Sequence, residues 1–414
     1  MPGEELTPRA RPRTVFLSAL EPSADFHAAA LIAAVRRHRP ETRFVGLAGP
    51  QMQAAGCEAL FDFTGRSAML LGVVRVAGLA LDLLRRIDRM FAAGVADLFV
   101  PVDSPTFNLP LARRAKARGL PVVYYIAPQV WAWAEFRVHK VRSRTDRLAV
   151  ILPFEEDYFR SHGIDAKYVG HPLIESLSRQ VVDTGEVAAL RSLGSPVVTC
   201  LPGSRRHVVD EILPGQVEVC RRIASRHPRA VFLFAAASDE LARKLTLFVE
   251  GMRGANVAFP YRVELGRNPE LITAADLVLV ASGTATLEVA WHRRPMIVMY
   301  NASKWGYRLI ARRLIRTEHL SLVNILAGRE LVPEFMPYYD SPDPIAAEAL
   351  ALLADTNRRE RIRQDLDELI RCLGTHRAAD ETASIILDTL DRSVSRRARS
   401  ADDTGPRGSR HRVW

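Results

Sequence analysis

Two short segments in the second half of the chain combine small residues with groups that bind phosphate. The first, LPGSRRH at residues 201–207, directly follows an apolar run that reads as a strand. Gly203 tolerates unusual backbone dihedral angles, Ser204 offers a hydroxyl and an amide, and Arg205 can hold a phosphate through two hydrogen bonds. This segment predicts a phosphate contact, with an ordinary turn and a surface arginine as the alternative.

The second segment, ASGTATLE at residues 281–288, leaves an apolar run through small residues and enters a predicted helix. The amides of Ser282, Gly283 and Thr284 and the positive end of the helix dipole would face an anion. Glu288, one turn further along, could bind a ribose hydroxyl, or it is a solvated helix carboxylate. Together the segments predict a nucleotide site. The chain has neither a dinucleotide-binding fingerprint nor a GxxxxGK motif, which argues against hydride transfer and ATP hydrolysis.

Carboxylates occupy similar positions in the first half of the chain. Glu21 and Asp25 follow the first apolar run, and Asp103 follows the run LFVPV. A carboxylate within hydrogen-bond reach of an acceptor hydroxyl can take its proton as a new bond forms, so each is a candidate general base. The alternative for each is a helix cap or a buried ion pair. His27 and His171 are further candidates, although a single histidine is more often a packed or solvated side chain.

The elements that would position these groups are short apolar runs alternating with amphipathic stretches, the order typical of parallel sheets covered by helices. The fold class is therefore α/β, with two Rossmann-like domains facing across a cleft. We expect strands at residues 14–19, 43–48, 98–102, 122–126, 147–151 and 167–169 in the first domain, and at 197–201, 231–236, 256–259, 277–280 and 296–300 in the second. Ligands of open parallel sheets bind at the carboxyl ends of the strands, which would gather the candidate residues around one crevice.

Charge and composition narrow the class of partner. Among 414 residues, 57 are basic and 47 are acidic, which gives a net charge of +10, and only five of the basic residues are lysines. Arginine binds phosphate through a planar fork, so the surplus favours phosphate-bearing partners or anionic lipid. Nucleic acid is not expected, because no zinc-finger spacing or RNA-recognition pattern accompanies the charge.

The four cysteines, Cys57, Cys200, Cys220 and Cys372, lack the short paired spacing of a zinc site, a redox motif or a disulfide scaffold. This spacing argues against all three classes. We expect no metal and no cofactor. The first residues contain no apolar stretch followed by a small-residue cleavage site, so the sequence predicts a cytoplasmic protein.

One segment breaks the alternation: AMLLGVVRVAGLALDLL, at residues 68–84, is almost entirely apolar. With Arg75 and Asp82 inside, it falls short of the roughly 20 apolar residues that cross a bilayer. One interpretation is a helix buried under the first sheet. The other is a helix whose apolar side faces a lipid chain or a membrane surface, with Arg75 and the arginines after it at the level of the head groups.

The chain also contains, in order, the strings FVGLAGPQMQAAGCEALFD, DSPTFNLPLA, YYIAPQVWAW, PFEEDYF, VGHP, LPGSRRHVVDE, ASGTATLE and SLVNILAGRELVPE. In order and spacing these strings resemble the lipid-A-disaccharide synthase family, from about residue 14 to residue 390. The resemblance implies a metal-independent, inverting glycosyltransferase of the two-domain GT-B type. The implied reaction joins UDP-2,3-diacylglucosamine to 2,3-diacylglucosamine 1-phosphate (lipid X), giving lipid A disaccharide 1-phosphate and UDP at the cytoplasmic face of the inner membrane.

The resemblance implies roles for particular residues. Asp103 matches the aspartate of the family's DxPxFN motif and is the expected general base, with Glu21 and Asp25 as further catalytic carboxylates. The residues implied on the UDP side are Ser204, Arg205, Ser282, Gly283, Thr284, Glu288 and Asn324. The residues implied on the acceptor and lipid side are Ser23, Met69, Leu70, Val73, Val74 and Arg75.

We expect a disordered segment at residues 1–13, an acceptor- and lipid-binding domain at 14–185, a UDP-sugar-binding domain at 195–365, a helix packing back at 366–390, and a disordered basic tail at 391–414. The implied partners are the UDP-acyl-sugar donor, the acyl-sugar phosphate acceptor and the inner-membrane surface, which the protein would approach as a peripheral protein. Members of the family can also form homodimers by exchanging C-terminal regions.

The first loop departs from the family pattern. The family usually reads GEASGD, whereas this chain reads LEPSAD at residues 20–25, so both glycines are replaced. A backbone that needed a positive φ at Leu20 or Ala24 would be strained by the added Cβ. Three alternatives stay open: a divergent GT-B paralogue that acts on another UDP-sugar or lipid acceptor, a UDP-sugar epimerase of similar build, and a catalytically silent protein that binds UDP or lipid.

Overall fold

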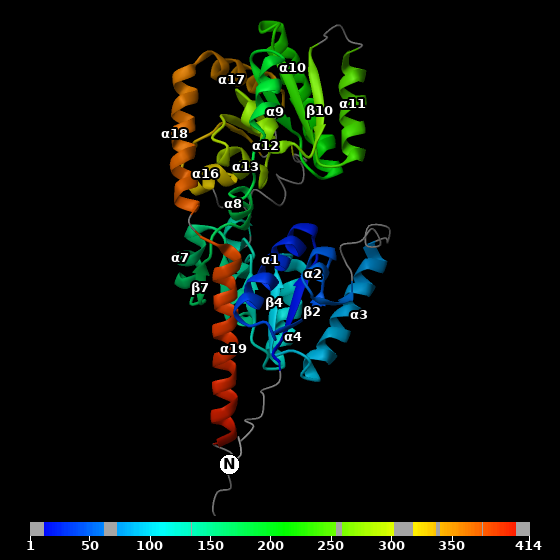
Figure 1. The fold of residues 1–414 in the computed structure, drawn as a ribbon, viewed down its shortest axis with the longest axis vertical. Coiled ribbons are helices and arrows are strands. Elements are labelled where there is room, and N and C mark those ends of the chain that lie inside the picture. Colours follow the sequence, from blue (N-terminus) through cyan, green and yellow to red (C-terminus); the bar gives the residue numbers. More distant parts are fainter. Residues whose placement is uncertain are drawn as a thin grey trace, which may run out of the picture. The chain divides into compact units, whose positions relative to one another are not determined.

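The computed structural model describes residues 12–61, 73–133, 135–253, 259–301, 318–336, 340–374 and 376–402. The chain forms two compact units (Figure 1), Met1–Pro172 together with His376–Trp414, and Leu173–Thr375. The sequence predicts that the first domain runs to residue 185 and the second begins at 195. The division lies earlier because Ile174, Leu177 and Leu190 are buried in the hydrophobic core of the second unit.

The first unit is built on a parallel sheet whose strands follow the apolar runs of the sequence. Its described strands are β1 (Thr14–Ala19), β2 (Arg43–Leu47), β3 (Glu58–Phe61), β4 (Leu98–Val102), β5 (Val123–Tyr125), β6 (Arg147–Val150) and β7 (Ala166–Tyr168). Their order is β3-β2-β1-β4-β5-β6-β7, and neighbouring strands run parallel. In the central register, Phe16 of β1 pairs with Val45 of β2 and Phe99 of β4. The strand order reverses between β1 and β4, the kind of point at which open α/β sheets bind ligands.

Two layers of helices pack on this sheet. The helices are α1 (Pro22–His38), α2 (Pro50–Ala54), α3 (Val73–Ala92), α4 (Pro105–Ala117), α5 (Val130–Trp133), α6 (Val138–Arg144), α7 (Pro153–Ser161) and α19 (Ala378–Asp402). Helix α1 packs against α2 and α19, and α4 packs against α3 and α6. Phe91 of α3 meets Phe16 of the sheet edge to face, with 5.1 Å between the ring centroids, which ties that layer to the core.

The second unit repeats the plan with a smaller parallel sheet. Its described strands are β8 (Val197–Leu201), β9 (Val231–Ala236), β10 (Tyr261–Leu265), β11 (Leu277–Ala281), β12 (Met296–Met299) and β13 (Glu334–Phe335). Their order is β10-β9-β8-β11-β12-β13, so the order reverses between β8 and β11. The strand expected at residues 256–259 begins instead at Tyr261, and residues 254–258 lie outside the described ranges.

Helices also cover the second sheet. They are α8 (Pro172–Leu177), α9 (Thr184–Ser192), α10 (Arg206–Arg226), α11 (Asp239–Arg253), α12 (Asn268–Ala274), α13 (Ala285–Trp291), α16 (Leu322–Ala327), α17 (Asp343–Ala354) and α18 (Thr356–Leu373). Helix α10 packs against α17, and α13 packs against α16 and α18.

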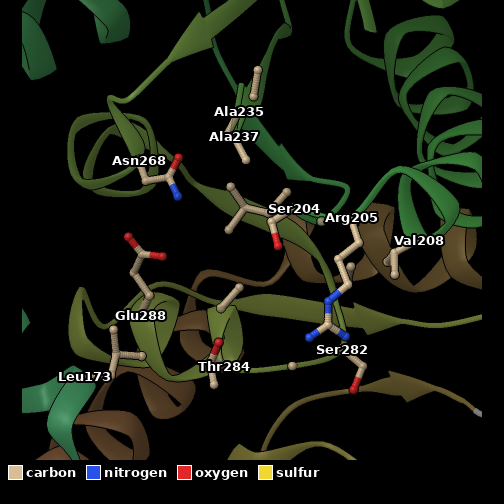
Figure 2. Close-up of a pocket in the computed structure, with 16 residues that line it drawn as sticks. Leu173, Ser204, Arg205, Val208, Ala235, Ala237, Asn268, Ser282, Thr284 and Glu288 are labelled. Carbon is tan, nitrogen blue, oxygen red and sulfur yellow. The ribbon is translucent and has the colours of Figure 1, made fainter. Parts of the chain in front are cut away.

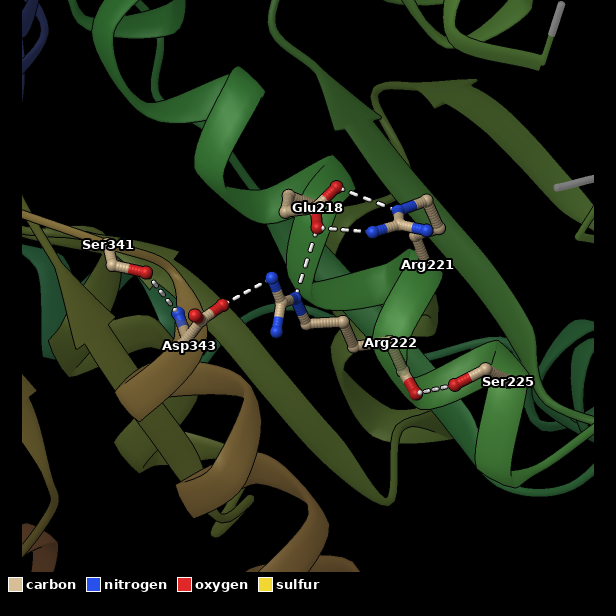
Figure 3. Close-up of polar contacts among 6 residues, drawn as sticks. All are labelled: Glu218, Arg221, Arg222, Ser225, Ser341 and Asp343. Carbon is tan, nitrogen blue, oxygen red and sulfur yellow. Dashed lines mark hydrogen bonds and ion pairs between the residues drawn. The ribbon is translucent and has the colours of Figure 1, made fainter. Parts of the chain in front are cut away.

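A chain of charged contacts joins α10 to α17 (Figure 3). On α10, Glu218 accepts from Arg221 at 2.8 and 2.7 Å and from Arg222 at 3.0 Å, and Arg222 also pairs with Asp343 at the start of α17. The hydrogen bond from Arg221 is the main cause that lowers the pKa of Glu218. Because these side chains are partly exposed, we regard the contacts as setting how α10 and α17 meet more than as a large source of stability.

The C-terminal part of the chain corrects two expectations. The sequence predicts one helix packing back at residues 366–390 and a disordered tail from 391. Residues 366–373 instead belong to α18 of the second unit, while α19 packs against α1 and remains helical to Asp402. Ile386 is buried, and Asp391 binds Arg39, at the end of α1, at 3.0 and 3.1 Å, so apolar packing and an ion pair both hold α19 in the first unit.

Helix α3 contains the second part of the apolar segment. Leu83, Leu84 and Ile87 are buried in the same cluster as Phe16, whereas Arg85 is exposed. Leu83 and Leu84 thus follow the buried interpretation, whereas Leu81 is 43% exposed, so the side chains described in this part of the segment lie on a buried side and a solvent side of the helix. None of the helices in the described ranges is long and apolar enough to cross a membrane.

Candidate functional site

A cavity of about 470 Å³ lies where the loops after β8 and β11 meet, at the switch point of the second sheet (Figure 2). It brings together the two segments predicted to bind phosphate, through Gly203, Ser204, Arg205, Ser282, Gly283, Thr284 and Glu288. Leu201, Ala281 and Ala285 of the same two segments also line it. The lining residues that sequence reasoning missed are Leu173, Val208, Ala235, Ala236, Ala237 and Asn268. The volume and the few convergent polar groups suit a small polar ligand.

The loop after β8 needs its glycine for two reasons. Gly203 has φ +113°, and a Cβ at this position would lie 2.8 Å from Cγ1 of Val208, so both the conformation and the space exclude a side chain. The turn places Arg205 at the N-cap of α10, whose first N–H groups have no acceptor within the helix. The loop thus offers a guanidinium group, the Ser204 hydroxyl and the positive end of a long helix to an anion.

The loop after β11 leaves its backbone open to a ligand. Gly283 has φ +144°, and no heavy atom lies within 4 Å of the place a Cβ would take. The Ser282 N–H donates to the carbonyl oxygen of Met299 at 3.1 Å, and the Thr286 hydroxyl donates to the carbonyl oxygen of Gly283 at 2.8 Å. These bonds hold the loop at both ends, so a ligand would meet a backbone that is already ordered.

Glu288 and Asn268 form a polar pair in the same cavity. Burial raises the pKa of the Glu288 carboxyl, and a hydrogen bond with the Asn268 side chain opposes this rise. A carboxylate beside an amide can bind sugar hydroxyls, since one group accepts and the other both donates and accepts. Asn268 comes soon after β10, as the other site residues follow their strands. The signal that found those residues failed here because the strand was expected at 256–259.

Asn324, which was expected to contact UDP, lies away from the cavity. Its side chain is fully buried and does not line the cavity. Its Oδ1 accepts from the N–H groups of Leu331 and Val332 at 2.9 and 3.0 Å, and its Nδ2 donates to Glu334 at 2.9 Å. The physical role visible in the structure is to hold the segment that leads into β13.

The first unit has Asp103 at its own switch point, directly after β4. Asp103 is half-buried, and its N–H donates to the carbonyl oxygen of Tyr125 at 3.0 Å. Asp103 and Ser104 both have left-handed backbone, with φ 51° and 48°, and Ile126, after the neighbouring β5, has φ 58°. Residues with a Cβ rarely adopt this conformation, and such strain is concentrated at functional sites.

The loop after β1 reaches the same switch point without strain. Glu21 is extended, with φ −118° and ψ 153°, and α1 begins at Pro22, the first helical position that proline favours. Neither Leu20 nor Ala24 is among the described residues with positive φ. The loss of the two glycines therefore costs this loop nothing in backbone conformation, and Glu21 and Ser23 remain exposed.

Asp25, expected as a catalytic carboxylate, is buried and occupied by backbone amides. Its Oδ1 accepts from the N–H groups of Gly49 and Met52 at 2.9 and 3.1 Å, and its Oδ2 accepts from that of Gln51 at 2.9 Å. These bonds cap the N-terminus of α2. The helix-cap alternative is thus the one that the geometry supports.

Two histidines of the first unit are neutral near pH 7. Burial lowers the pKa of His27 to about 4. Burial is also the main cause that lowers the pKa of His171 to about 4, and a repulsive contribution from His27 adds to it. A mutual charge effect requires the two rings to lie near one another.

The structure describes only some of the residues that are expected to contact lipid. Val73, Val74 and Arg75 form the first turn of α3, whereas Met69 and Leu70 lie outside the described residues. Within the described ranges, His, Cys, Asp and Glu form no group of three or more that could hold a metal ion.

Comparisons with known proteins match this arrangement over most of the chain. A family model described as lipid-A-disaccharide synthetase matches residues 15–388. The lipid-A-disaccharide synthase of Myxococcus xanthus is 36% identical over 387 residues, which cover 92% of this chain and 98% of that protein. The lipid-A-disaccharide synthase of Nitrosococcus oceani is 38% identical over 369 residues, which cover 87% of this chain and 92% of that protein.

Solved structures share the fold at much lower identity. A complex of MnaA from S. aureus with UDP has a TM-score of 0.61 at 11% identity and covers 93% of this chain and 97% of its own. A UDP-GlcNAc 2-epimerase from Neisseria meningitidis, bound to UDP-GlcNAc, has a TM-score of 0.57 at 14% identity and covers 92% and 99%. At these identities the likeness concerns the fold alone, and it confirms the α/β class with two Rossmann-like units of the GT-B type.

Proposed function

The chain belongs to the lipid-A-disaccharide synthase family, and we propose that its second unit binds a UDP-acyl-sugar donor while its first unit activates an acyl-sugar phosphate acceptor. Membership makes the protein a glycosyltransferase of lipid A biosynthesis that forms the lipid A disaccharide. The substrates we assign are UDP-2,3-diacylglucosamine and 2,3-diacylglucosamine 1-phosphate. The observation that carries the assignment is the cavity that joins Arg205 to the β11 loop at the second switch point.

The donor cavity suits a leaving diphosphate. As the C1–O bond to UDP breaks, negative charge develops on the departing phosphate. Arg205, the open backbone at Gly283 and the N-terminus of α10 are groups that can stabilise this charge. Glu288 and Asn268 are placed to bind hydroxyl groups of the nucleotide sugar.

Asp103 is the base we propose for the acceptor. It would take the proton of the acceptor 6-hydroxyl as that oxygen bonds to C1 of the donor, while the electron pair of the broken bond leaves with UDP and C1 inverts. Glu21, in the loop on the other side of the same switch point, and Ser23, in the first turn of α1, are exposed to solvent, and we propose that they contact the acceptor. We do not assign this role to Asp25, because its carboxylate accepts three backbone hydrogen bonds.

The test of the donor site is UDP release by the purified protein with both acyl-sugar substrates in the presence of EDTA. We expect Arg205→Ala to lower kcat/KM by about 100-fold, because a charge-assisted contact to the leaving group is lost. Arg206→Ala is the matched control, since Arg206 is exposed, binds Glu240 at 3.2 Å and does not line the cavity. Full activity in Arg205→Ala would contradict the phosphate contact, and loss of wild-type activity in EDTA would contradict metal independence.

We also propose that α3 brings the protein to the cytoplasmic face of the inner membrane as a peripheral protein. Arg85, Arg86 and Arg89 are exposed on this helix, and Leu81 is 43% exposed beside them. Cationic side chains near an anionic surface contribute about 1 kcal/mol each. In co-sedimentation with vesicles that contain phosphatidylglycerol, Arg85→Glu combined with Arg89→Glu should lower binding by at least about tenfold, whereas Arg262→Glu, on β10 of the second unit, should not. Equal binding of both variants would contradict the proposal.

Experiments on the same purified protein distinguish two alternative functions. Calorimetric UDP binding without turnover of any acyl-sugar pair would favour a silent binding protein, although the unstrained first loop removes the structural reason for that reading. Turnover of a different UDP-sugar or acceptor in substrate profiling would favour a paralogue. The homodimer that the resemblance implies is tested by analytical ultracentrifugation, in which a monomer would contradict it.

A further inference from the structure

The main chain after β4 adopts an unfavourable, left-handed conformation, which other contacts must stabilise. Asp103 and Ser104 are consecutive residues with a Cβ, and both are left-handed, with φ 51° and 48°. Helix α4 begins at Pro105, with Ser104 as its N-cap, so the chain turns from strand to helix within two residues. Left-handed backbone is unfavourable for such residues, and it persists only where the surroundings over-determine it.

Asn108, in the first turns of α4, provides several of the hydrogen bonds that hold this left-handed conformation. Its side chain is fully buried, and its Nδ2 donates to the carbonyl oxygen of Asp103 at 2.7 Å and to that of Val102 at 3.2 Å. Its Oδ1 accepts from the Ser18 hydroxyl of β1 at 2.6 Å, and Nδ2 also lies 3.4 Å from the Ser18 carbonyl oxygen. One amide therefore ties the turn after β4 to the neighbouring strand β1.

Tyr124 of β5 holds the same peptide group from the other side. Its hydroxyl donates to the carbonyl oxygen of Asp103 at 2.7 Å, so this oxygen accepts two side-chain hydrogen bonds. The Asp103 N–H donates to the carbonyl oxygen of Tyr125 at 3.0 Å. The backbone of Asp103 is therefore held directly by groups from α4 and β5, and through Asn108 it is linked to Ser18 of β1. Burial raises the pKa of Tyr124, so its hydroxyl keeps the proton that it donates.

We propose that Asn108 and Tyr124, oriented in part by Ser18, are positioning residues that hold Asp103 in its left-handed conformation and thereby aim its carboxylate at the acceptor hydroxyl. This inference rests on the proposed role of Asp103 as the base. It assigns no contact with substrate to Asn108 or Tyr124. Their effect is on the geometry of proton transfer, where small displacements lower the rate strongly.

The variants that test it differ in how much packing they disturb. Tyr124→Phe removes only the hydroxyl, and Asn108→Ser removes the amide. We expect kcat to fall by about 5-fold in Tyr124→Phe and by at least about 20-fold in Asn108→Ser, with both KM values within about twofold of wild type. Tyr261→Phe is the matched control, because its hydroxyl lies in the second unit, 3.4 Å from Glu250, and it should keep wild-type kcat. If Asn108→Ser fails to fold, the kcat of Tyr124→Phe still tests whether these side chains position Asp103.

A double-mutant cycle separates positioning from a general structural effect. In an Asp103→Asn background, Tyr124→Phe and Asn108→Ser should lower the residual kcat no further, because there is no base left to aim. A purely structural role would lower activity in both backgrounds. If Asp103→Asn keeps wild-type activity, the proposed base fails. If Asp103→Asn is inactive while Tyr124→Phe and Asn108→Ser keep wild-type kcat, the base stands and the positioning inference is overturned.

Discussion

At the scale of single residues, the proposed donor site depends on a glycine that no other residue replaces without cost. Gly203 combines φ +113° with a neighbour, Cγ1 of Val208, 2.8 Å from the place a Cβ would take. Gly203→Ala must therefore shift the loop that carries Arg205. We expect UDP affinity, measured by calorimetry, to fall by at least about tenfold, with a strain cost of about 1–2 kcal/mol in the free energy of unfolding.

Gly251→Ala provides the control for this prediction. Gly251 lies in α11, and no heavy atom is within 4 Å of the place its Cβ would take. Alanine there should keep wild-type UDP affinity and stabilise the helix by up to about 1 kcal/mol. Unchanged UDP affinity in Gly203→Ala would show that the β8 loop tolerates movement and does not hold the nucleotide.

At the scale of elements, the short helix α2 depends on a carboxylate from α1. Asp25 accepts hydrogen bonds from Gly49, Gln51 and Met52, so Asp25→Asn turns a donor toward an N–H group that needs an acceptor. We expect the free energy of unfolding, from urea denaturation, to fall by about 1–3 kcal/mol, with kcat within about threefold of wild type. A large loss of kcat at unchanged stability would instead make Asp25 a catalytic carboxylate.

The elements also show where local patterns suffice. The apolar runs predicted most of the strands, including those before Glu21, Asp103, Ser204 and Ser282, because a buried parallel strand must be continuously apolar. The bounds of α19 and the start of β10 were missed. Both depend on packing against segments far away in the sequence, as the bond between Asp391 and Arg39 illustrates.

At the scale of the whole molecule, the chain leaves the first unit directly after His171 and Pro172. Burial lowers the pKa of His171 to about 4, below its ordinary value of 6.5. The unfolded chain therefore binds a proton in the window from pH 6.5 to 4 that the folded protein does not, and stability is lost as the pH falls through that window. Between pH 7 and pH 5 the loss from this histidine amounts to about 2 kcal/mol.

We expect His171→Gln to reduce the fall in unfolding free energy between pH 7 and pH 5 by about that amount, measured by urea denaturation at both values. Glu155 acts in the opposite direction, because burial raises its pKa to about 7 and its contribution to stability declines as the pH rises. The comparison of variant with wild type cancels this effect. An equal fall in both proteins would show that His171 is not protonated on unfolding in this range.

The sequence by itself determined the α/β class, the family and the segments proposed to bind phosphate, because apolar runs, small-residue turns and motifs are local properties of the chain. Only the tertiary structure decided the strand orders, whose reversals next to β1 and β8 gather Asp103 and Arg205 each at a switch point. It also separated residues that look alike in sequence. Asp25 caps a helix and Asn324 holds a core segment, whereas Asn108 supports Asp103. These roles depend on which distant segments meet, and a one-dimensional pattern does not record that.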